Sequence, residues 1–193
     1  MRPARGTYFV IDIECNGPVP GLYDMVSLGA VVVHNRDGRA VRGESLYLEM
    51  RPQAPRFDST AAAIHGLDQS RLHREGLPRA EACRRLAAWV KKQSDPHTQA
   101  IFVGHNAPFD WSFVNYAFVA ENIPNPFGYK ALDTRALAMG VLGTHWLEAS
   151  KEKIQGPLNL PPEDKTTKHR ADADAAYQAK ILIALLNRIS VQP

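Results

Sequence analysis

Two carboxylates lie inside a stretch that otherwise has the composition of a buried β-strand. The stretch reads Tyr-Phe-Val-Ile-Asp-Ile-Glu over residues 8–14. Because strand side chains alternate between two faces, Asp12 and Glu14 point one way, whereas Ile11 and Ile13 point the other way. Neighbouring carboxylates in apolar surroundings either take up a proton or bind a cation, and hard divalent metals are the usual cations. The alternative is a strand end that emerges into water at Asp12, and this stretch alone leaves both open.

Further acidic side chains follow at two predicted helix starts. Asp110 falls in the first turn of a helix that begins soon after Gly104, and Asp174 falls in the first turn of the last helix. The helix dipole stabilises an acidic residue there by about 0.3 to 1 kcal/mol, which accounts for both aspartates without any chemistry. It does not account for His169. We expect His169 in the loop before the helix, turned towards the site that Asp174 enters.

The apolar pattern predicts the elements that position these residues. An antiparallel β-meander opens the chain, and a further strand and several amphipathic helices follow, which predicts one α/β domain over residues 1–193. Apart from one short helix, residues 51–79 are expected to be irregular. The predicted strands are 8–14, 25–34, 45–50 and 100–103, and the predicted helices are 59–64, 79–92, from just before Pro108 to 120, 134–142, 146–154 and 171–189.

Composition restricts the class of protein. The chain has 193 residues, 45% of them hydrophobic, which is enough for one sizeable core. The net charge of +3 is compatible with a polyanionic partner but does not require one. Cys15 and Cys83 are too few for a zinc cluster and far apart, so we expect reduced thiols in a cytoplasmic protein. The chain has neither a signal-peptide pattern nor the roughly 18 consecutive apolar residues of a membrane span, so no membrane association is expected.

The acidic motifs, taken in order, resemble those of the DEDDh 3′-to-5′ exonucleases, which include bacterial proofreading subunits, oligoribonuclease and ribonuclease T. The resemblance extends from about Tyr8 to Leu186, and residues 106–143 are most similar to ribonuclease T. The matching motifs are Asp12-Ile13-Glu14, then Asn106 with Phe109-Asp110, then His169 with Asp174, together with the intervening segment Ile64-His65-Gly66.

This resemblance implies a ribonuclease H-like fold, in which a mixed central β-sheet of about five strands, the first three antiparallel, is flanked by α-helices. It also implies an activity. The enzyme would hydrolyse terminal phosphodiesters at single-stranded nucleic acid 3′ ends and release nucleoside 5′-monophosphates. Two Mg²⁺ or Mn²⁺ ions would stabilise the attacking and leaving oxygens. His169 would accept a proton from the attacking water. A homodimer is expected by resemblance alone. The implied metal ligands, which also count as catalytic residues, are Asp12, Glu14, Asp110 and Asp174.

A pocket for the terminal nucleotide is also implied. Cys15 and Asn16 replace the threonine or serine of many relatives, so they bear on the choice of sugar. Aromatic side chains can stack on bases, although core packing explains most aromatics equally well. Basic residues before the third motif could meet phosphates or simply lie at the surface. The predicted substrate-binding residues are Cys15, Asn16, Gly17, Ile64, His65, Asn106, Phe109 and Arg170; further stacking candidates are Trp111, Phe127 and Trp146, and further basic ones are Lys151, Lys153, Lys165 and Lys168.

Several functions remain open at this point. Trimming of RNA 3′ ends, as by ribonuclease T, is the first prediction. A DNA exonuclease of the proofreading type is the alternative within enzymes. A catalytically silent nucleic-acid-binding module is an alternative of another class, and a purely structural role for the acids would leave no metal site at all.

Overall fold

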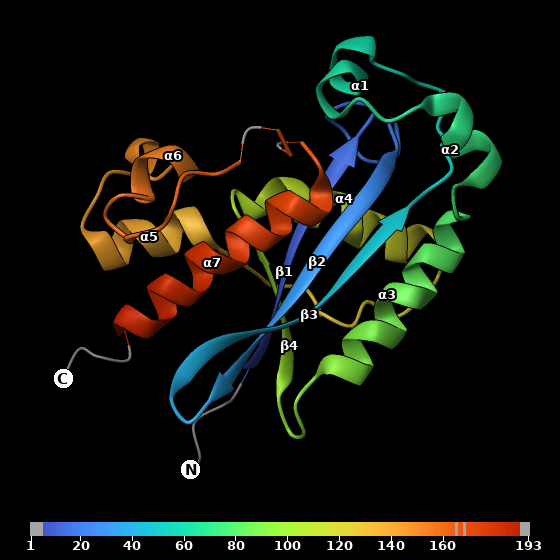
Figure 1. Cartoon of the computed structure of the whole chain (residues 1–193). Helices are drawn as coiled ribbons and strands as arrows, with labels where there is room; N and C mark the ends of the chain where they lie inside the picture. The colour runs from blue at the N-terminus through green and yellow to red at the C-terminus, as the bar shows by residue number, and fades with distance from the viewer. Residues whose placement is uncertain (1–5, 165, 168, 190–193) are drawn as a thin grey trace.

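The computed structural model describes residues 6–164, 166–167 and 169–189, and a mixed five-stranded sheet forms its centre (Figure 1). The strands lie in the order β3-β2-β1-β4-β5. Strand β1 therefore occupies the middle of the sheet, with a neighbour on each side. The strand bounds are β1 Gly6–Cys15, β2 Met25–Arg36, β3 Arg39–Glu49, β4 Gln99–Gly104 and β5 Ala131–Asp133.

The strand directions confirm the predicted α/β class. Strand β2 is antiparallel to both β1 and β3, whereas β4 is parallel to both β1 and β5. The fifth strand, β5, is too short to give an apolar pattern, and the sequence did not locate it. Strand β3 begins at Arg39 and not at the predicted Ser45, because its first half is an exposed edge without alternating apolar residues.

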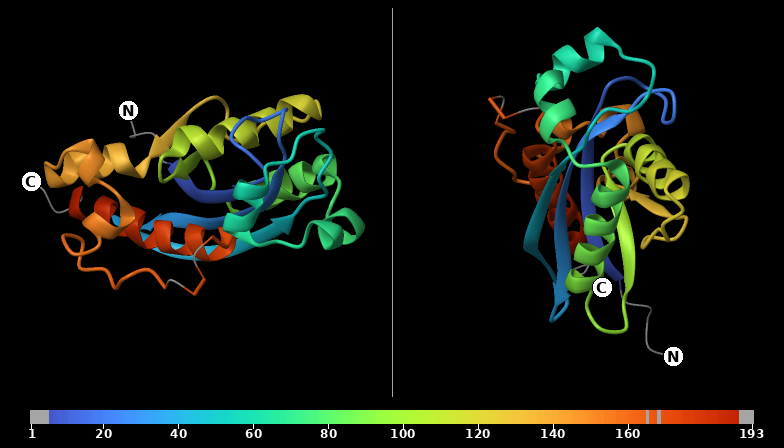
Figure 2. Two further views of the ribbon diagram at one scale, coloured as in Figure 1. Left: turned by 90° about the horizontal axis from the view of Figure 1, so that it is seen from above. Right: turned by 90° about the vertical axis from the view of Figure 1, so that its right-hand side faces the viewer.

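Helices cover both faces of the sheet (Figure 2). Helix α7 (Ala171–Ile189) packs on one face, where Val10 belongs to the shared core. Helices α3 (Arg79–Gln93) and α4 (Ala107–Ala120) pack on the opposite face, around Phe9 and Phe102. Since Asp12 and Glu14 share the face of Val10, they lie on the α7 side of β1. No helix within the described residues is long and apolar enough to cross a membrane.

The remaining helices differ from the prediction in two places. Helix α2 lies in the segment that was expected to be irregular, and it was missed because only Leu72 is buried, so no apolar stripe marks it. The predicted helix 146–154 divides into a 3-10 turn and a short helix at Ala149 and Ser150. The bounds are α1 Ser59–His65, α2 Gln69–Glu75, α5 Thr134–Leu142, the 3-10 turn Trp146–Glu148 and α6 Lys151–Ile154.

A glycine allows the start of α7 to approach the sheet. Gly29 of β2 lies opposite Asp12 of β1 in the antiparallel register. A Cβ atom at Gly29 would lie only 2.1 Å from the carbonyl oxygen of Ala171, the first residue of α7. The missing side chain therefore lets the first turn of α7, with Asp174, reach the region beside Asp12.

Candidate active site

Three of the predicted metal ligands lie together at the end of β1. Asp12 and Glu14 come from that strand, and Asp174 comes from the first turn of α7. Each offers a carboxylate oxygen, and these oxygens all lie within 4.8 Å of one another. The sheet and α7 thus bring together acids that are far apart in the sequence.

Asp110 reaches the same strand from the other side. It lies in the first turn of α4, is buried, and its Oδ1 accepts a hydrogen bond of 3.1 Å from the backbone N–H of Ile13. Asn106 precedes α4 in the left-handed conformation with φ of 70°, which asparagine tolerates better than most residues. Its backbone N–H donates to Oδ1 of Asp133 over 2.9 Å. This turn directs α4, and with it Asp110, towards β1.

The electrostatics of these acids favour cation binding. Burial, followed by the charges of Asp174 and Asp110, raises the pKa of Glu14 to about 7. Burial raises the pKa of Asp110 to about 7, although the hydrogen bond from Ile13 opposes the rise. Burial and the charges of Asp110, Asp174 and Glu14 raise the pKa of Asp12 well above its ordinary value. A divalent cation would relieve both the burial cost and the repulsion, and oxygen ligands of this kind fit Mg²⁺ or Mn²⁺.

His169 lies before α7, as predicted. Its φ is 64°, its side chain is exposed, and its backbone N–H donates to Oδ2 of Asp174 over 2.8 Å. This hydrogen bond ties the position of His169 to one of the candidate metal ligands. The role of the imidazole as a general base remains a prediction.

Gln178 is a site residue that the sequence did not reveal. It lies one helical turn after Asp174 on α7, and 2% of it is exposed. Its Nε2 donates to Oδ1 of Asp12 over 2.6 Å, and its Oε1 accepts the backbone N–H of His105. Gln178 on α7 therefore orients Asp12 and is itself held by His105, the residue after β4. Its spacing of four residues from Asp174, which puts both on one helix face, was the available signal.

The basic residues before α7 have individual partners. Lys151 donates to both Asp174 and Glu163, so it lies at the acidic cluster and not at the free surface. Lys153 pairs with Glu148 on the exposed side of α6. Lys165 and Lys168 lie outside the described residues.

The predicted sugar-pocket residues form a hydrogen-bonded group of their own. Oδ1 of Asn16 lies 3.2 Å from Nε2 of His65. Nδ2 of Asn16 donates to Oε1 of Gln69 over 3.0 Å. Nδ1 of His65 accepts the backbone N–H of Leu67, so Nε2 carries the proton in the neutral ring. Burial lowers the pKa of His65, in keeping with that neutral form. These side chains join the end of β1 to α1 and α2, and contact of Asn16 or His65 with substrate remains a prediction.

Two other residues of the predicted pocket shape the end of β1. The Cys15 side chain is half-buried, and burial raises the pKa of its thiol to about 11. Gly17 is buried, and a Cβ atom there would lie 2.2 Å from the ring of Tyr23. Cys15 therefore remains a neutral thiol, and Gly17 allows close packing of the loop.

The apolar and aromatic candidates divide between surface and core. Phe109, beside Asp110 on α4, is 37% exposed, and Ile64 at the end of α1 is 54% exposed, so both are open to a ligand. Phe127 is buried in the core, and Trp111 packs against that core with an edge-on contact to Phe102. Both rings thus pack with the core. Trp146 stacks with the guanidinium of Arg135 at 4.0 Å.

Arg170 is exposed and donates to Oδ2 of Asp172 over 3.0 Å. Asn106 is also exposed, and its side chain makes no capping hydrogen bond to α4. Both side chains are open to solvent, so their predicted contact with substrate remains a prediction.

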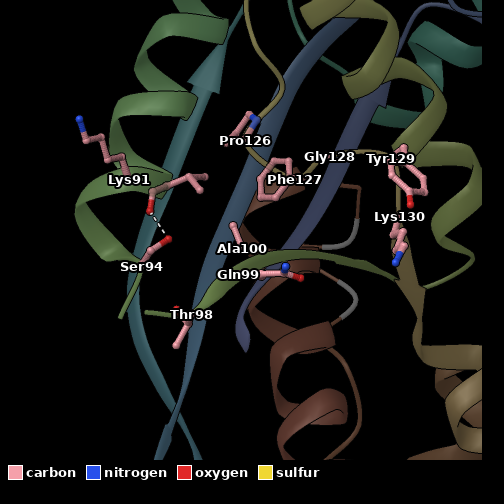
Figure 3. A pocket seen from close by; sticks show the side chains of 11 residues that line it. Lys91, Ser94, Thr98, Gln99, Ala100, Pro126, Phe127, Gly128, Tyr129 and Lys130 are labelled. Carbon is pink, nitrogen blue, oxygen red and sulfur yellow. Dashed lines mark hydrogen bonds between the residues drawn. The ribbon is translucent and has the colours of Figure 1, made fainter. Parts of the chain in front are cut away.

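Figure 3 shows side chains that line a cavity of about 580 Å³. The end of α3, the start of β4 and the segment before β5 line it, with Lys91, Gln99 and Lys130 among the lining residues. Gln99 pairs with Gly6, at the opposite end of β1 from Glu14. This cavity contains none of the predicted catalytic residues.

Similarity to known proteins identifies the family. The family model described as Exonuclease matches residues 9–182. The chain is 33% identical over 190 residues to the 3′-5′ DNA exonuclease Cap18 of Escherichia coli, covering 98% of this chain and 96% of that protein. It is 30% identical over 185 residues to ribonuclease T of Marinobacter nauticus, covering 93% of this chain and 81% of that protein.

A solved structure shares the fold. The nuclease domain of 3′hExo, a DEDDh family member bound to rAMP, has a TM-score of 0.74 at 11% identity, covering 92% of this chain and 89% of that chain. This likeness confirms the predicted fold class. Exonucleases of this family depend on metal ions, and the acidic cluster on β1 and α7 supplies suitable ligands. The chain therefore belongs to the exonuclease family, and it is a hydrolase that removes nucleotides from the 3′ ends of nucleic acids.

Proposed function

We propose that this exonuclease binds two Mg²⁺ or Mn²⁺ ions and degrades single-stranded DNA from the 3′ end, releasing nucleoside 5′-monophosphates. The observation that carries the proposal is the convergence of Asp12, Glu14 and Asp174 within 4.8 Å at the end of β1, the strand that Asp110 contacts. A single-domain enzyme over residues 1–193, a cytoplasmic location and a homodimer remain parts of the proposal.

Each of the predicted catalytic residues has a proposed role. Asp12, Glu14, Asp110 and Asp174 would hold the metal ions. When bound, these ions stabilise the charge on the attacking and leaving oxygens of an in-line phosphoryl displacement. A ring nitrogen of His169 would accept a proton from the attacking water, because histidine is the side chain that most often serves as a general base.

Exposed apolar groups near the acids would hold the terminal nucleotide. Phe109 adjoins Asp110 in the chain, and Ile64 adjoins His65, which is linked by hydrogen bonding to the end of β1. Each stacked base contributes about 1 to 3 kcal/mol with little dependence on sequence. We therefore infer that Phe109 and Ile64 contact the last base and select a free end without selecting its identity.

The choice of DNA rests on the residues after Glu14. Discrimination between RNA and DNA requires a contact with the 2′-hydroxyl. Asn16 is 2% exposed and its amide is already hydrogen-bonded to Gln69, so it offers little to a ribose. The thiol of Cys15 is a weak hydrogen-bonding group. These two side chains therefore provide no selection for ribose, and the similarity to Cap18, a DNA exonuclease by name, favours DNA over the RNA substrate expected from the sequence.

Trimming of RNA 3′ ends is the second candidate, and similarity to ribonuclease T favours it. Single-turnover rates on DNA and RNA oligomers of matched sequence, each labelled at the 5′ end, separate the two candidates. We expect metal-dependent shortening from the 3′ end, with the faster rate on DNA. A faster rate on RNA would select the second candidate.

A further inference from the structure

A lysine ammonium lies directly at the acidic cluster. Lys151 is the first residue of α6, and its Nζ donates to Oδ1 of Asp174 and, over 2.7 Å, to Oε1 of Glu163. The side chains are largely buried, with 15% of Lys151, 7% of Asp174 and 13% of Glu163 exposed. Asp174 thus shares one oxygen with an ammonium group while belonging to the candidate metal ligands.

The charge of Lys151 acts on the whole cluster. Burial and the neighbouring carboxylates raise the pKa values of Asp12 and Glu14, and the positive charge of Lys151 opposes that rise. Burial by itself would lower the pKa of Lys151, but its hydrogen bonds to Asp174 and Glu163 raise it above the ordinary value. Lys151 is therefore a charged internal counter-ion of these acids.

We propose that Lys151 competes with the divalent cation for Asp174 and that Glu163 holds the ammonium once the metal has taken Asp174. The proposal rests on the metal site proposed above. Lys151 and Glu163 are positioning residues in this scheme, because they act through Asp174 and not on the substrate.

The physical reason lies in the sharing of one carboxylate. A divalent ion and an ammonium on the same carboxylate repel each other, and a buried ammonium without a partner is costly. Glu163 gives Lys151 a second acceptor, so the ammonium can leave Asp174 without losing its only charged contact. The same pair fixes the segment around Glu163, which leads along the chain to His169, against the start of α6.

Binding of Mn²⁺, followed by electron paramagnetic resonance without any nucleic acid, tests this proposal. We expect Lys151→Met to raise the Mn²⁺ affinity by at least about tenfold, the scale of coupling between close charges. Lys153→Met is the matched control, because Lys153 lies on the same helix, is 50% exposed and pairs only with Glu148 among the described ion pairs. Its affinity should equal that of the wild type.

Substitution of Glu163 tests the second half of the proposal. Glu163→Gln should lower the Mn²⁺ affinity, because Lys151 is then held by Asp174 alone. That loss should disappear when Lys151→Met is also present. Asp164→Asn is the control, since it removes one neighbouring charge while keeping the local hydrogen bonds to Thr166 feasible. A similar loss with and without Lys151 would show a general field effect and overturn the role of Glu163.

The outcomes distinguish failure of the competition proposal from failure of the proposed metal site. Thermal unfolding in EDTA checks that each variant folds, and Lys151→Gln replaces Lys151→Met in both tests if Lys151→Met does not fold. Mn²⁺ binding that is equal in the wild type and folded Lys151→Met would overturn the competition and leave the metal site intact. No Mn²⁺ binding to either protein would overturn both.

Discussion

Nε2 of Gln178 donates a hydrogen bond of 2.6 Å to Oδ1 of Asp12, and this contact joins α7 to the central strand of the sheet. The same amide accepts the backbone N–H of His105 at the end of β4. One buried side chain thus connects β1, β4 and α7 where the three elements meet. This hydrogen bond orients the carboxylate of Asp12 relative to α7.

Loss of this amide should weaken the metal site. Gln178→Met keeps the approximate size of the side chain but removes the donor to Asp12. Because residues that orient metal ligands typically contribute about 10- to 100-fold, we expect a loss of that size in Mn²⁺ affinity and in exonuclease rate. Gln99→Met, at the far end of β4, is the control and should retain both. An unchanged Mn²⁺ affinity in Gln178→Met would contradict the orienting role.

Gly29 should be intolerant of a side chain. In Gly29→Ala the new methyl group would overlap the Ala171 carbonyl, so the start of α7 must move away from Asp12. We expect a loss of about 1 to 3 kcal/mol in the free energy of unfolding together with weaker Mn²⁺ binding. Gly140→Ala in α5 has open space around it and should be neutral or stabilising by up to about 1 kcal/mol. Chemical denaturation measures both, and equal stabilities would refute the steric explanation.

Removal of the imidazole should slow the reaction without removing the metal site. His169 contacts Asp174 through its backbone N–H, which any substituted residue other than proline retains. We expect His169→Ala to lose about 10²- to 10⁴-fold in rate, as for loss of a general base. Its Mn²⁺ affinity should stay near that of the wild type. A wild-type rate in single-turnover assays would exclude the proposed role.

The metal-free protein should lose stability as Glu14 ionises. Burial, then the charges of Asp174 and Asp110, raises the pKa of Glu14 to about 7, so the folded chain binds more protons than the unfolded chain below that pH. The contribution of Glu14 to stability therefore falls as pH rises from its ordinary pKa of about 4.3 towards 7. A tenfold difference in proton affinity between the folded and unfolded chains corresponds to about 1.4 kcal/mol of this contribution.

Comparison with a neutral isostere isolates this effect from other titrating groups. In EDTA, Glu14→Gln should gain stability relative to the wild type as pH rises through that window, and excess Mn²⁺ should reverse the order. Urea unfolding at a series of pH values provides the measurement. A difference between the two proteins that does not vary with pH would count against the raised pKa.

The positions of the acidic residues could be predicted, because local sequence patterns assign each of them to a strand face or a helix start. Alternation along residues 8–14 put Asp12 and Glu14 on one face, and helix-start signals put Asp110 and Asp174 in first turns. The order of these motifs resembled a known family, and that order is what distinguished the acids from ordinary helix-start residues. Secondary structure and family resemblance together therefore identified the acids.

The residues that support the acids depend on tertiary contacts, which a local sequence pattern does not reveal. Lys151 precedes Asp174 by 23 residues, and only the folded chain brings the two side chains together. The hydrogen bond from the Asn16 amide to Gln69 was not foreseen, because Gln69 begins α2, a helix without an apolar stripe. The supporting residues around the acids consequently became visible only in the structure.

The most direct test of the account follows a 5′-labelled single-stranded DNA oligomer through a time course with the wild type and with Asp12→Ala. With Mg²⁺ or Mn²⁺, the wild type should shorten the oligomer one nucleotide at a time from the 3′ end, and EDTA should stop the reaction. Asp12→Ala, checked for folding by thermal denaturation, should leave the oligomer intact under all conditions. Near-normal shortening by Asp12→Ala, or by the wild type in EDTA, would contradict the account.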